Sequence, residues 1–203
     1  MCQIYDKIWY DKSMNICLFC SSNELPEKYT HPATRLADQL AAGGHQLVYG
    51  GSSHGLMGRM ARVMQAGGAR VTGVTLSVYS ASIHRGVDEL IMAKTLGERK
   101  AAMLERSDVI LVLVGGIGTL DELTELIELK RQWHHDKQII VLNTDGFYDG
   151  FRMQLERIAN ENMLRAGENT HLAIRSLDEF VTFVESPNEA ILLLGNVTTM
   201  APR

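Results

Sequence analysis

Residues 109–122 read Val-Ile-Leu-Val-Leu-Val-Gly-Gly-Ile-Gly-Thr-Leu-Asp-Glu, and they carry the clearest indication of the fold class in the sequence. Its first six residues form an uninterrupted apolar run, which is typical of a strand that a parallel sheet buries on both faces. The glycine-rich turn 115–118 leads into a helical pattern over residues 120–133. A strand, a tight turn and a helix in this order predict the repeating unit of an α/β protein.

The same order recurs on both sides of this stretch. The predicted strands are 15–20, 46–49, 70–75, 89–93, 109–114 and 138–143. The predicted helices are 31–42, 55–66, 96–106, 120–133 and 148–160. This alternation predicts the α/β class, with a three-layer, doubly wound, Rossmann-like parallel sheet and helices on both of its faces.

We expect a single Rossmann-like nucleotide-binding domain over residues 15–185, with an N-terminal extension, 1–14, and a C-terminal tail, 186–203. Ser176 and Glu179 fit a capping box, and we expect it to open a last helix that includes residues 180–184. The short apolar segment 191–194 is compatible with either a docking helix or a mobile tail.

The charge of the chain limits its partners. The 20 Lys and Arg against 24 Asp and Glu give a formal net charge of -4, so we expect neither nucleic acid nor a membrane as a partner. No apolar run approaches the roughly 20 residues of a membrane span, and residues 1–14 lack the pattern of a signal peptide. We therefore expect a cytoplasmic protein.

Cysteine usage fits the same compartment. Cys2, Cys17 and Cys20 are too few for a disulfide framework. Cys17 and Cys20 lie three apart on a predicted strand and therefore point to opposite faces. No second pair completes a zinc site, and we expect no metal and no cofactor.

Two glycine-rich turns follow predicted strands. The first spans residues 50–58 and the second spans residues 115–118. Glycine allows the backbone to turn sharply and approach an anion, and the N-terminus of the following helix adds donor N–H groups. Because the carboxyl ends of parallel strands share one edge, both turns indicate a site for a phosphate-bearing small molecule.

Charged residues near the start of two predicted helices are candidates for chemistry. Glu122 and Glu125 are three apart and share one helix face. Arg99 and Lys100 begin another helix, where basic residues oppose the helix dipole. A purely structural explanation stays open, because Thr119-x-x-Glu122 and Thr95-x-x-Glu98 also fit helix-capping patterns.

Taken together, these motifs resemble those of a known family. They are Phe19-Cys20-Ser21-Ser22, Tyr49-Gly50-Gly51, Gly55-Leu56-Met57-Gly58, Glu98-Arg99-Lys100 and Gly115-Gly116-Ile117-Gly118-Thr119 with Glu122. Over about residues 15–185 the chain resembles the Lonely Guy family of cytokinin-activating phosphoribohydrolases, long mislabelled as lysine decarboxylases. The resemblance implies a homodimer, or a higher homo-oligomer, that hydrolyses the N-glycosidic bond of a nucleoside 5'-monophosphate to free base and ribose 5-phosphate.

The residues suit this chemistry. A carboxylate near the anomeric carbon stabilises positive charge on the sugar and orients water, and we assign this role to Glu122. Arg99, which is always charged, helps the departing base. The other expected substrate and phosphate contacts are Ser22, Gly50, Gly51, Met57, Lys100, Gly115, Gly116, Ile117, Gly118, Thr119 and Glu125.

Four positions depart from the family pattern: Ser21, Ser52, Leu76 and Val114. A Cβ at Ser21 or Ser52 is expected to crowd the ligand or to demand a strained backbone. These departures concern the identity of the substrate more than bond cleavage. They also motivate an alternative function, a non-catalytic nucleotide-binding or carrier protein on the same fold.

Overall fold

The computed structural model describes residues 13–164 and 176–197. Within them, seven strands form one parallel sheet in the order β4-β3-β2-β1-β5-β6-β7. The strands are β1 (Asn15–Phe19), β2 (Gln46–Tyr49), β3 (Val71–Leu76), β4 (Glu89–Ala93), β5 (Val109–Val112), β6 (Ile139–Leu142) and β7 (Thr182–Val184). The expected doubly wound α/β fold is confirmed.

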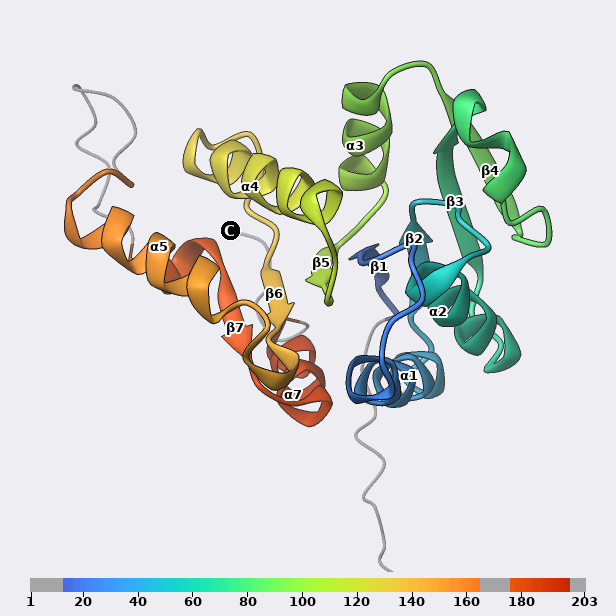
Figure 1. Ribbon diagram of the computed structural model, residues 1–203, viewed down its shortest axis with the longest axis horizontal. Coiled ribbons are helices and arrows are strands. Elements are labelled where there is room, and N and C mark those ends of the chain that lie inside the picture. The colour runs from blue at the N-terminus through green and yellow to red at the C-terminus, as the bar shows by residue number, and fades with distance from the viewer. Residues whose placement is uncertain (1–12, 165–175, 198–203) are drawn as a thin grey trace, which may run out of the picture.

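Helices cover both faces of the sheet (Figure 1). The α-helices are α1 (Glu27–Ala42), α2 (Gly55–Ala66), α3 (Leu96–Glu105), α4 (Ile117–Arg131), α5 (Asp149–Asn160), α6 (Leu177–Phe180) and α7 (Pro187–Val197). Two short 3-10 helices are η1 (Ser77–Ser82) and η2 (Thr144–Gly146). Helices α1, α2 and α7 lie on one face, and α3, α4, α5 and α6 lie on the other.

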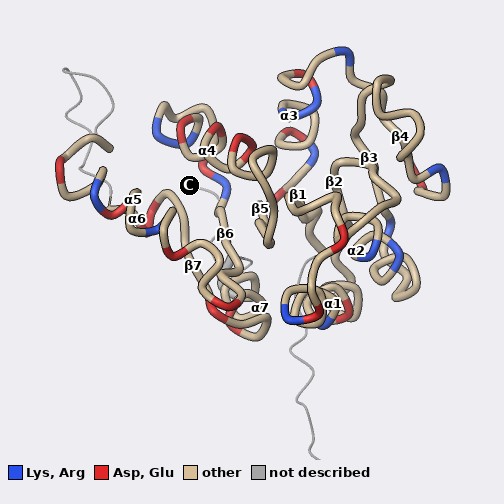
Figure 2. Tube along the Cα trace, viewed as in Figure 1, with Lys and Arg blue, Asp and Glu red and all other residues tan. Residues whose placement is uncertain are grey.

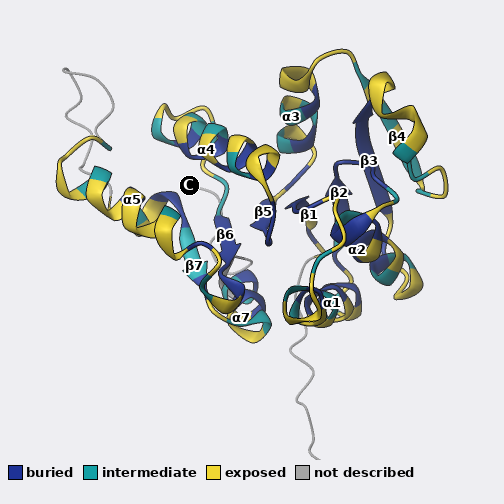
Figure 3. Ribbon diagram, in the orientation of Figure 1, coloured by how far each residue is buried: buried dark blue, intermediate teal, exposed yellow. Residues whose placement is uncertain are grey.

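The alternation of side chains along each strand divides the core into two layers. In β1, Ile16 and Leu18 pack toward α1 and α2, whereas Cys17 and Phe19 pack toward α3 and α4. Strands β3, β5 and β6 are consequently buried along their whole length (Figure 3). Cys20, just beyond β1, belongs to the same layer as Ile16, so Cys17 and Cys20 face opposite sides as expected.

Two helices begin earlier than the sequence suggests. Helix α1 begins at Glu27 behind the cap residue Pro26 and continues through Pro32, which the sequence places near its start. Helix α4 begins at Ile117, and its N-cap is Gly116, so the expected cap at Thr119 is wrong. Thr119 instead lies in the first turn of α4 and is buried.

The C-terminal part contains a second correction. The capping box of Ser176 and Glu179 is present, but the helix it opens ends at Phe180. Residues Thr182–Val184 form β7, which pairs with β6, because this β-branched segment supplies a further strand to the sheet edge. The following segment is helix α7, which packs on α1 and buries Ala190, Ile191 and Leu194. Of the two alternatives for residues 191–194, the docking helix is correct.

Charged residues lie mainly on the outer helices, and both signs occur on each of α1, α3, α4 and α5 (Figure 2). No described helix is long and apolar enough to cross a membrane.

Candidate active site

The carboxyl ends of four strands surround a cavity of about 360 Å³, within the range of roughly 300–1,000 Å³ that is usual for small-molecule sites. It lies where β1 has β2 on one side and β5 on the other, which is the point at which the strand order reverses. The cavity is lined by Cys20, Ser21, Ser22, Asn23, Gly50, Ser52, Met57, Thr75, Tyr79, Ser82, Arg99, Gly116, Ile117, Gly118, Thr119 and Glu122.

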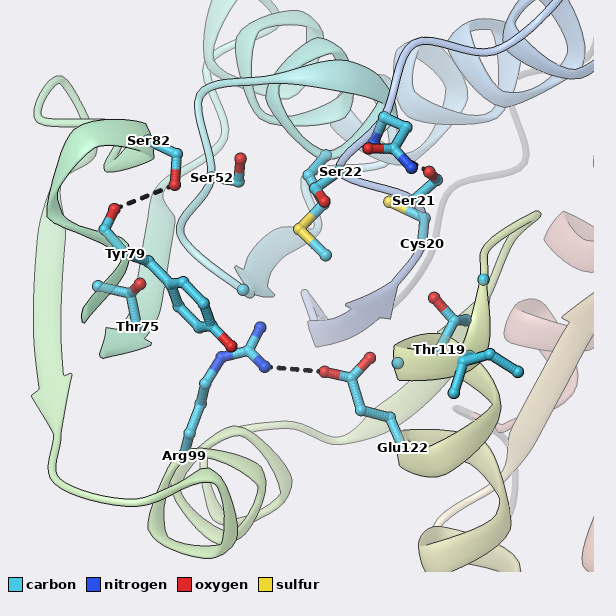
Figure 4. Close-up of a pocket in the computed structure, with 16 residues that line it drawn as sticks. Cys20, Ser21, Ser22, Ser52, Thr75, Tyr79, Ser82, Arg99, Thr119 and Glu122 are labelled. Atoms are coloured by element: carbon cyan, nitrogen blue, oxygen red, sulfur yellow. Dashed lines mark hydrogen bonds and ion pairs between the residues drawn. The ribbon is translucent and has the colours of Figure 1, made fainter. Parts of the chain in front are cut away.

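Arg99 lies in the first turn of α3 and extends under β3 into the cavity (Figure 4). Its Nε donates a hydrogen bond of 3.0 Å to the carbonyl oxygen of Val74. Its Nη1 donates one of 3.0 Å to Oε1 of Glu122. These two bonds fix the plane of a guanidinium whose side chain is only 9% exposed. Thr95 caps α3 by accepting from the Glu98 amide, which confirms that expected cap.

Glu122 approaches Arg99 from the opposite side, from the second turn of α4. Its side chain is 6% exposed. Burial raises the pKa of Glu122 to about 7, and the nearby Arg99 charge opposes this rise only in part. A carboxyl group with this pKa exchanges protons near neutral pH, as a general base requires. Because α4 is capped at Gly116, Glu122 does not form the capping box that the sequence left open. Its burial, its bond to Arg99 and its raised pKa make it a candidate for the chemistry.

The N-terminus of α4 supplies donors for an anion. The amides of Ile117, Gly118 and Thr119 belong to the first turn, for which the helix itself has no acceptors. Gly116 has no side chain to cap them, and these residues line the cavity. The macrodipole adds positive potential at the same point. This is the arrangement expected for a phosphate site.

The other glycine-rich turn is used differently. Two of the first amides of α2 bind the chain that follows β1: Met57 donates to the carbonyl of Ser21 at 3.0 Å, and Leu56 donates to that of Asn23 at 3.4 Å. Gly55, with a φ of +57°, lies so close to Ser22 that a Cβ would be 2.3 Å from the carbonyl oxygen. The turn thus joins two loops, and its helix N-terminus offers fewer donors to a ligand than that of α4.

The backbone of Ser21 and Ser52 is not strained, so that part of the expectation is wrong. Crowding of the ligand stays a prediction, since both residues line the cavity. Neither Ser21 nor Ser52 has a positive φ. Ser52 pairs in an antiparallel bridge with Ile83, which requires extended backbone. The amide of Ser21 donates a hydrogen bond of 3.0 Å to the carbonyl of Val114, so the loop after β1 stays bonded to the segment after β5. Both serine side chains also cap local turns, at the amides of Asn23 and His54.

Four of the predicted contacts lie outside the lining of the cavity. Lys100 forms ion pairs with Asp121, at 2.9 Å, and with Glu125, so these side chains connect α3 to α4 instead of facing the ligand. Gly115 packs against Thr119, where a Cβ would lie 2.1 Å from the hydroxyl oxygen. Gly51, with a φ of +73°, forms the turn behind the cavity wall. The other predicted residues meet in the cavity: Arg99, Glu122, Ser22, Gly50, Met57, Gly116, Ile117, Gly118 and Thr119.

Sequence reasoning missed the wall opposite α4. Thr75 is the penultimate residue of β3, and Tyr79 and Ser82 belong to η1. Tyr79 has no periodic pattern that would mark it, because η1 is an irregular connection. The polar residues Ser52 and Ser82 line the same wall, and their proximity depends on a bridge between segments some 30 positions apart.

Comparison with known proteins supports the family that the sequence motifs indicate. A family model described as "Possible lysine decarboxylase" matches residues 57–186. The chain is 37% identical over 154 residues to the probable cytokinin riboside 5'-monophosphate phosphoribohydrolase LOGL1 of Oryza sativa subsp. japonica, covering 74% of this chain and 69% of the relative. The chain belongs to the Lonely Guy family.

Two relatives from Arabidopsis thaliana extend this similarity. The Lonely Guy member named cytokinin riboside 5'-monophosphate phosphoribohydrolase LOG2 is 36% identical over 152 residues, which cover 73% of this chain and 71% of the relative. The probable phosphoribohydrolase LOG6 is 37% identical over 153 residues, which cover 74% of this chain and 76% of the relative.

Solved structures share the fold at lower identity. The molybdenum cofactor binding protein from Rippkaea orientalis has a TM-score of 0.69 and 19% identity, covering 93% of this chain and 99% of that chain. The molybdenum cofactor carrier protein from Chlamydomonas reinhardtii has a TM-score of 0.67 and also 19% identity, covering 93% of this chain and 100% of that chain. At this identity the likeness concerns the fold alone.

Proposed function

We propose that this Lonely Guy family member hydrolyses the N-glycosidic bond of a nucleoside 5'-monophosphate. The observation that carries the proposal is the buried pair of Arg99 and Glu122, 3.0 Å apart, beside the first turn of α4. The relatives named phosphoribohydrolases support the same reaction class.

The 5'-phosphate is bound by the amides of Ile117, Gly118 and Thr119, with the Thr119 hydroxyl as a further donor. Phosphate in this position places the ribose over the next turn of α4, toward Glu122. The phosphate is thus recognised by a helix N-terminus, in keeping with a chain that has no excess of basic residues.

In the reaction, the bond between C1' of the ribose and the base nitrogen breaks, and the electron pair leaves with the base. Glu122 in its carboxylate form stabilises the positive charge that develops at C1' and accepts a proton from the attacking water. The water oxygen bonds to C1', which yields ribose 5-phosphate. The base nitrogen takes up a proton from solvent and Glu122 releases its proton to solvent, so that one molecule of water is consumed and the carboxylate is restored. Arg99 keeps its charge throughout and stabilises negative charge on the departing base.

The proposal extends to the substrate and the assembly. A cytokinin riboside monophosphate or an AMP-like nucleotide is the expected substrate, and a homodimer in the cytoplasm is the expected form. Light scattering of the purified protein measures its mass in solution. A mass equal to a single chain contradicts the dimer.

The decisive experiment is incubation with AMP, GMP and a cytokinin riboside 5'-monophosphate, followed by chromatography for free base and ribose 5-phosphate. Glu122→Gln is expected to lower kcat/KM at least 100-fold, since it removes a base that contributes about 10²–10⁴-fold. Glu128→Gln is the matched control, because Glu128 lies on the same helix but pairs with Arg131 at the surface. Nucleotide binding without release of base would support the carrier alternative instead.

A further inference from the structure

The cavity has two different ends (Figure 4). Thr119 and the start of α4 lie at one end, and Tyr79 and Thr75 lie at the other. Arg99 and Glu122 lie between them, joined by their hydrogen bond. A nucleotide also has an order, from phosphate through ribose to base, with the glycosidic bond between the last two. When the phosphate is at α4 and that bond is at the Arg99–Glu122 pair, the base extends toward Tyr79.

Tyr79 offers a flat aromatic surface at this end. Its ring points into the cavity toward the guanidinium of Arg99, although the residue belongs to the connection η1. The side chain is not used in the core, because Tyr79 is 44% exposed. An aromatic ring that lines a cavity without packing in the core is free to contact a ligand.

The chain around Tyr79 is attached to the rest of the site. The carbonyl of Ser82 accepts hydrogen bonds from the amide of Ser53, at 2.8 Å, and from its hydroxyl, at 3.1 Å. The amide of His84 donates to the carbonyl of Gly51 at 2.8 Å. The hydroxyl of Ser82 donates to the carbonyl of Tyr79 itself at 3.0 Å. These bonds hold η1 against the turn after β2, so the tyrosine is held at the wall of the cavity.

We infer that Tyr79 stacks on the nucleobase and thereby determines which nucleotides the site accepts, an inference that rests on the proposed function. Stacking needs only a flat π-surface, so it favours purines, whose two rings overlap the phenol more fully than the single ring of a pyrimidine. Thr75 lies beside the ring of Tyr79 at the same end of the cavity and offers a hydroxyl group to polar atoms at the edge of the base (Figure 4).

The test compares Tyr79→Ala, Tyr79→Phe and the unsubstituted protein, with Val78→Ala as a control. Val78 is the neighbouring residue of η1, is 77% exposed and does not line the cavity. The measurements are kcat and KM for AMP and, with each variant also carrying Glu122→Gln so that AMP is not consumed, the dissociation constants of AMP and of ribose 5-phosphate by calorimetry. Ribose 5-phosphate has no base and therefore reports on the rest of the site.

Tyr79→Ala is expected to raise KM for AMP and its dissociation constant about ten-fold, the effect of losing one base–aromatic stack. The affinity for ribose 5-phosphate is expected to stay within two-fold in the same variant. Tyr79→Phe retains the ring and is expected to retain binding, and Val78→Ala is expected to match the unsubstituted protein.

The inference is overturned when Tyr79→Ala binds AMP as tightly as the unsubstituted protein does. It is also overturned when the substitution weakens the binding of AMP and of ribose 5-phosphate by the same factor. The proposed function fails separately, when the unsubstituted protein binds AMP but releases no base from any nucleotide. In that case the two dissociation constants still decide the role of Tyr79. A protein that binds no nucleotide contradicts both.

Discussion

Gly50 lies against the guanidinium of Arg99 so closely that a Cβ on the glycine would be 2.2 Å from Nη2. The φ of Gly50 is not in the left-handed region, so the backbone conformation does not require glycine there. What requires it is the arginine, whose other nitrogens are bonded to Val74 and Glu122. Gly50, which follows β2, therefore leaves the space that the guanidinium of Arg99 needs to reach Glu122.

Gly50→Ala is expected to lower kcat/KM for AMP about 100-fold. The added methyl group must push the guanidinium away from Glu122, and a misplacement of about 1 Å in an active site can cost about that factor. Initial rates over a range of AMP concentrations measure the effect. Gly150→Ala on α5 is the control, because a Cβ there meets no atom within 4 Å. Equal rates for the two alanine variants would show that the position of Arg99 does not matter.

The pKa of about 7 for Glu122 predicts how activity depends on pH. The proposed reaction uses the carboxylate form of Glu122, so kcat/KM for AMP is expected to rise with pH through about 7 and then to level off. The measurement is a profile of kcat/KM from pH 5 to pH 9. A flat profile across pH 7 would mean that Glu122 does not act as the base.

The same pKa predicts a dependence of stability on pH. Glu122 ionises at about 7 in the folded protein but near 4.5 in the unfolded chain. Between these values the folded state holds a proton that the unfolded state has lost, so the contribution of Glu122 to stability falls as the pH rises. Glutamine does not ionise, so Glu122→Gln lacks this pH-dependent contribution to stability. The Tm of the variant minus the Tm of the unsubstituted protein should therefore increase from pH 5 to pH 8. Thermal denaturation at both pH values tests this.

Much of this architecture could be predicted because its signals are local. Apolar strands such as β5 and the glycines that follow them are visible within about ten residues of sequence. The sequence indicates Arg99 and Glu122 as candidates but does not show that their side chains bond to each other. On a helix, adjacent residues point about 100° apart, so Arg99 enters the cavity while Lys100 turns to Glu125. The rotation of each helix on the sheet decides which of the two faces the ligand.

The remaining features depend on contacts between distant segments. Asn143 illustrates this: its side chain accepts from the amide of Tyr148 and donates to Asp149 and Glu185, which connects the ends of β6 and β7. No local pattern in the sequence shows that Asn143 makes these contacts, because Glu185 lies 42 positions away. Likewise, β7 follows a one-turn helix, and no local pattern shows that the chain will return to the sheet there.

Gly118 provides a test of the phosphate site that separates binding from stability. A Cβ on Gly118 meets no protein atom within 4 Å, because the residue faces the cavity. Gly118→Ala is expected to raise the dissociation constant of ribose 5-phosphate about ten-fold or more, because the methyl group obstructs the amides at the start of α4. It should not lower Tm, since alanine is a better helix former than glycine by up to about 1 kcal/mol. Calorimetric titration and thermal denaturation give the two quantities.

The matched comparison is Gly115→Ala, in which the Cβ would collide with Thr119. This variant should lower Tm as well as affinity, because a side chain of the first turn must move. Unchanged binding of ribose 5-phosphate by Gly118→Ala would place the phosphate away from α4.

Lys100 is expected to act through the position of its neighbours. Its ion pairs with Asp121 and Glu125 hold α3 against α4, and each helix carries one member of the proposed catalytic pair, Arg99 and Glu122. Hydrogen bonds to these two carboxylates raise the pKa of Lys100 despite partial burial, which lowers it, so the lysine is charged at neutral pH.

Lys100→Met should therefore lower Tm by a few degrees, since about 1 kcal/mol corresponds to roughly 2–4 °C in a domain of this size. It should also lower kcat several-fold, as Arg99 and Glu122 lose their alignment, while the affinity for ribose 5-phosphate changes less than two-fold. Arg157→Met removes an exposed ion pair with Glu161 and should affect none of these. A large loss of ribose 5-phosphate affinity in Lys100→Met, with Tm and kcat preserved, would instead make Lys100 a phosphate ligand, as the sequence alone suggested.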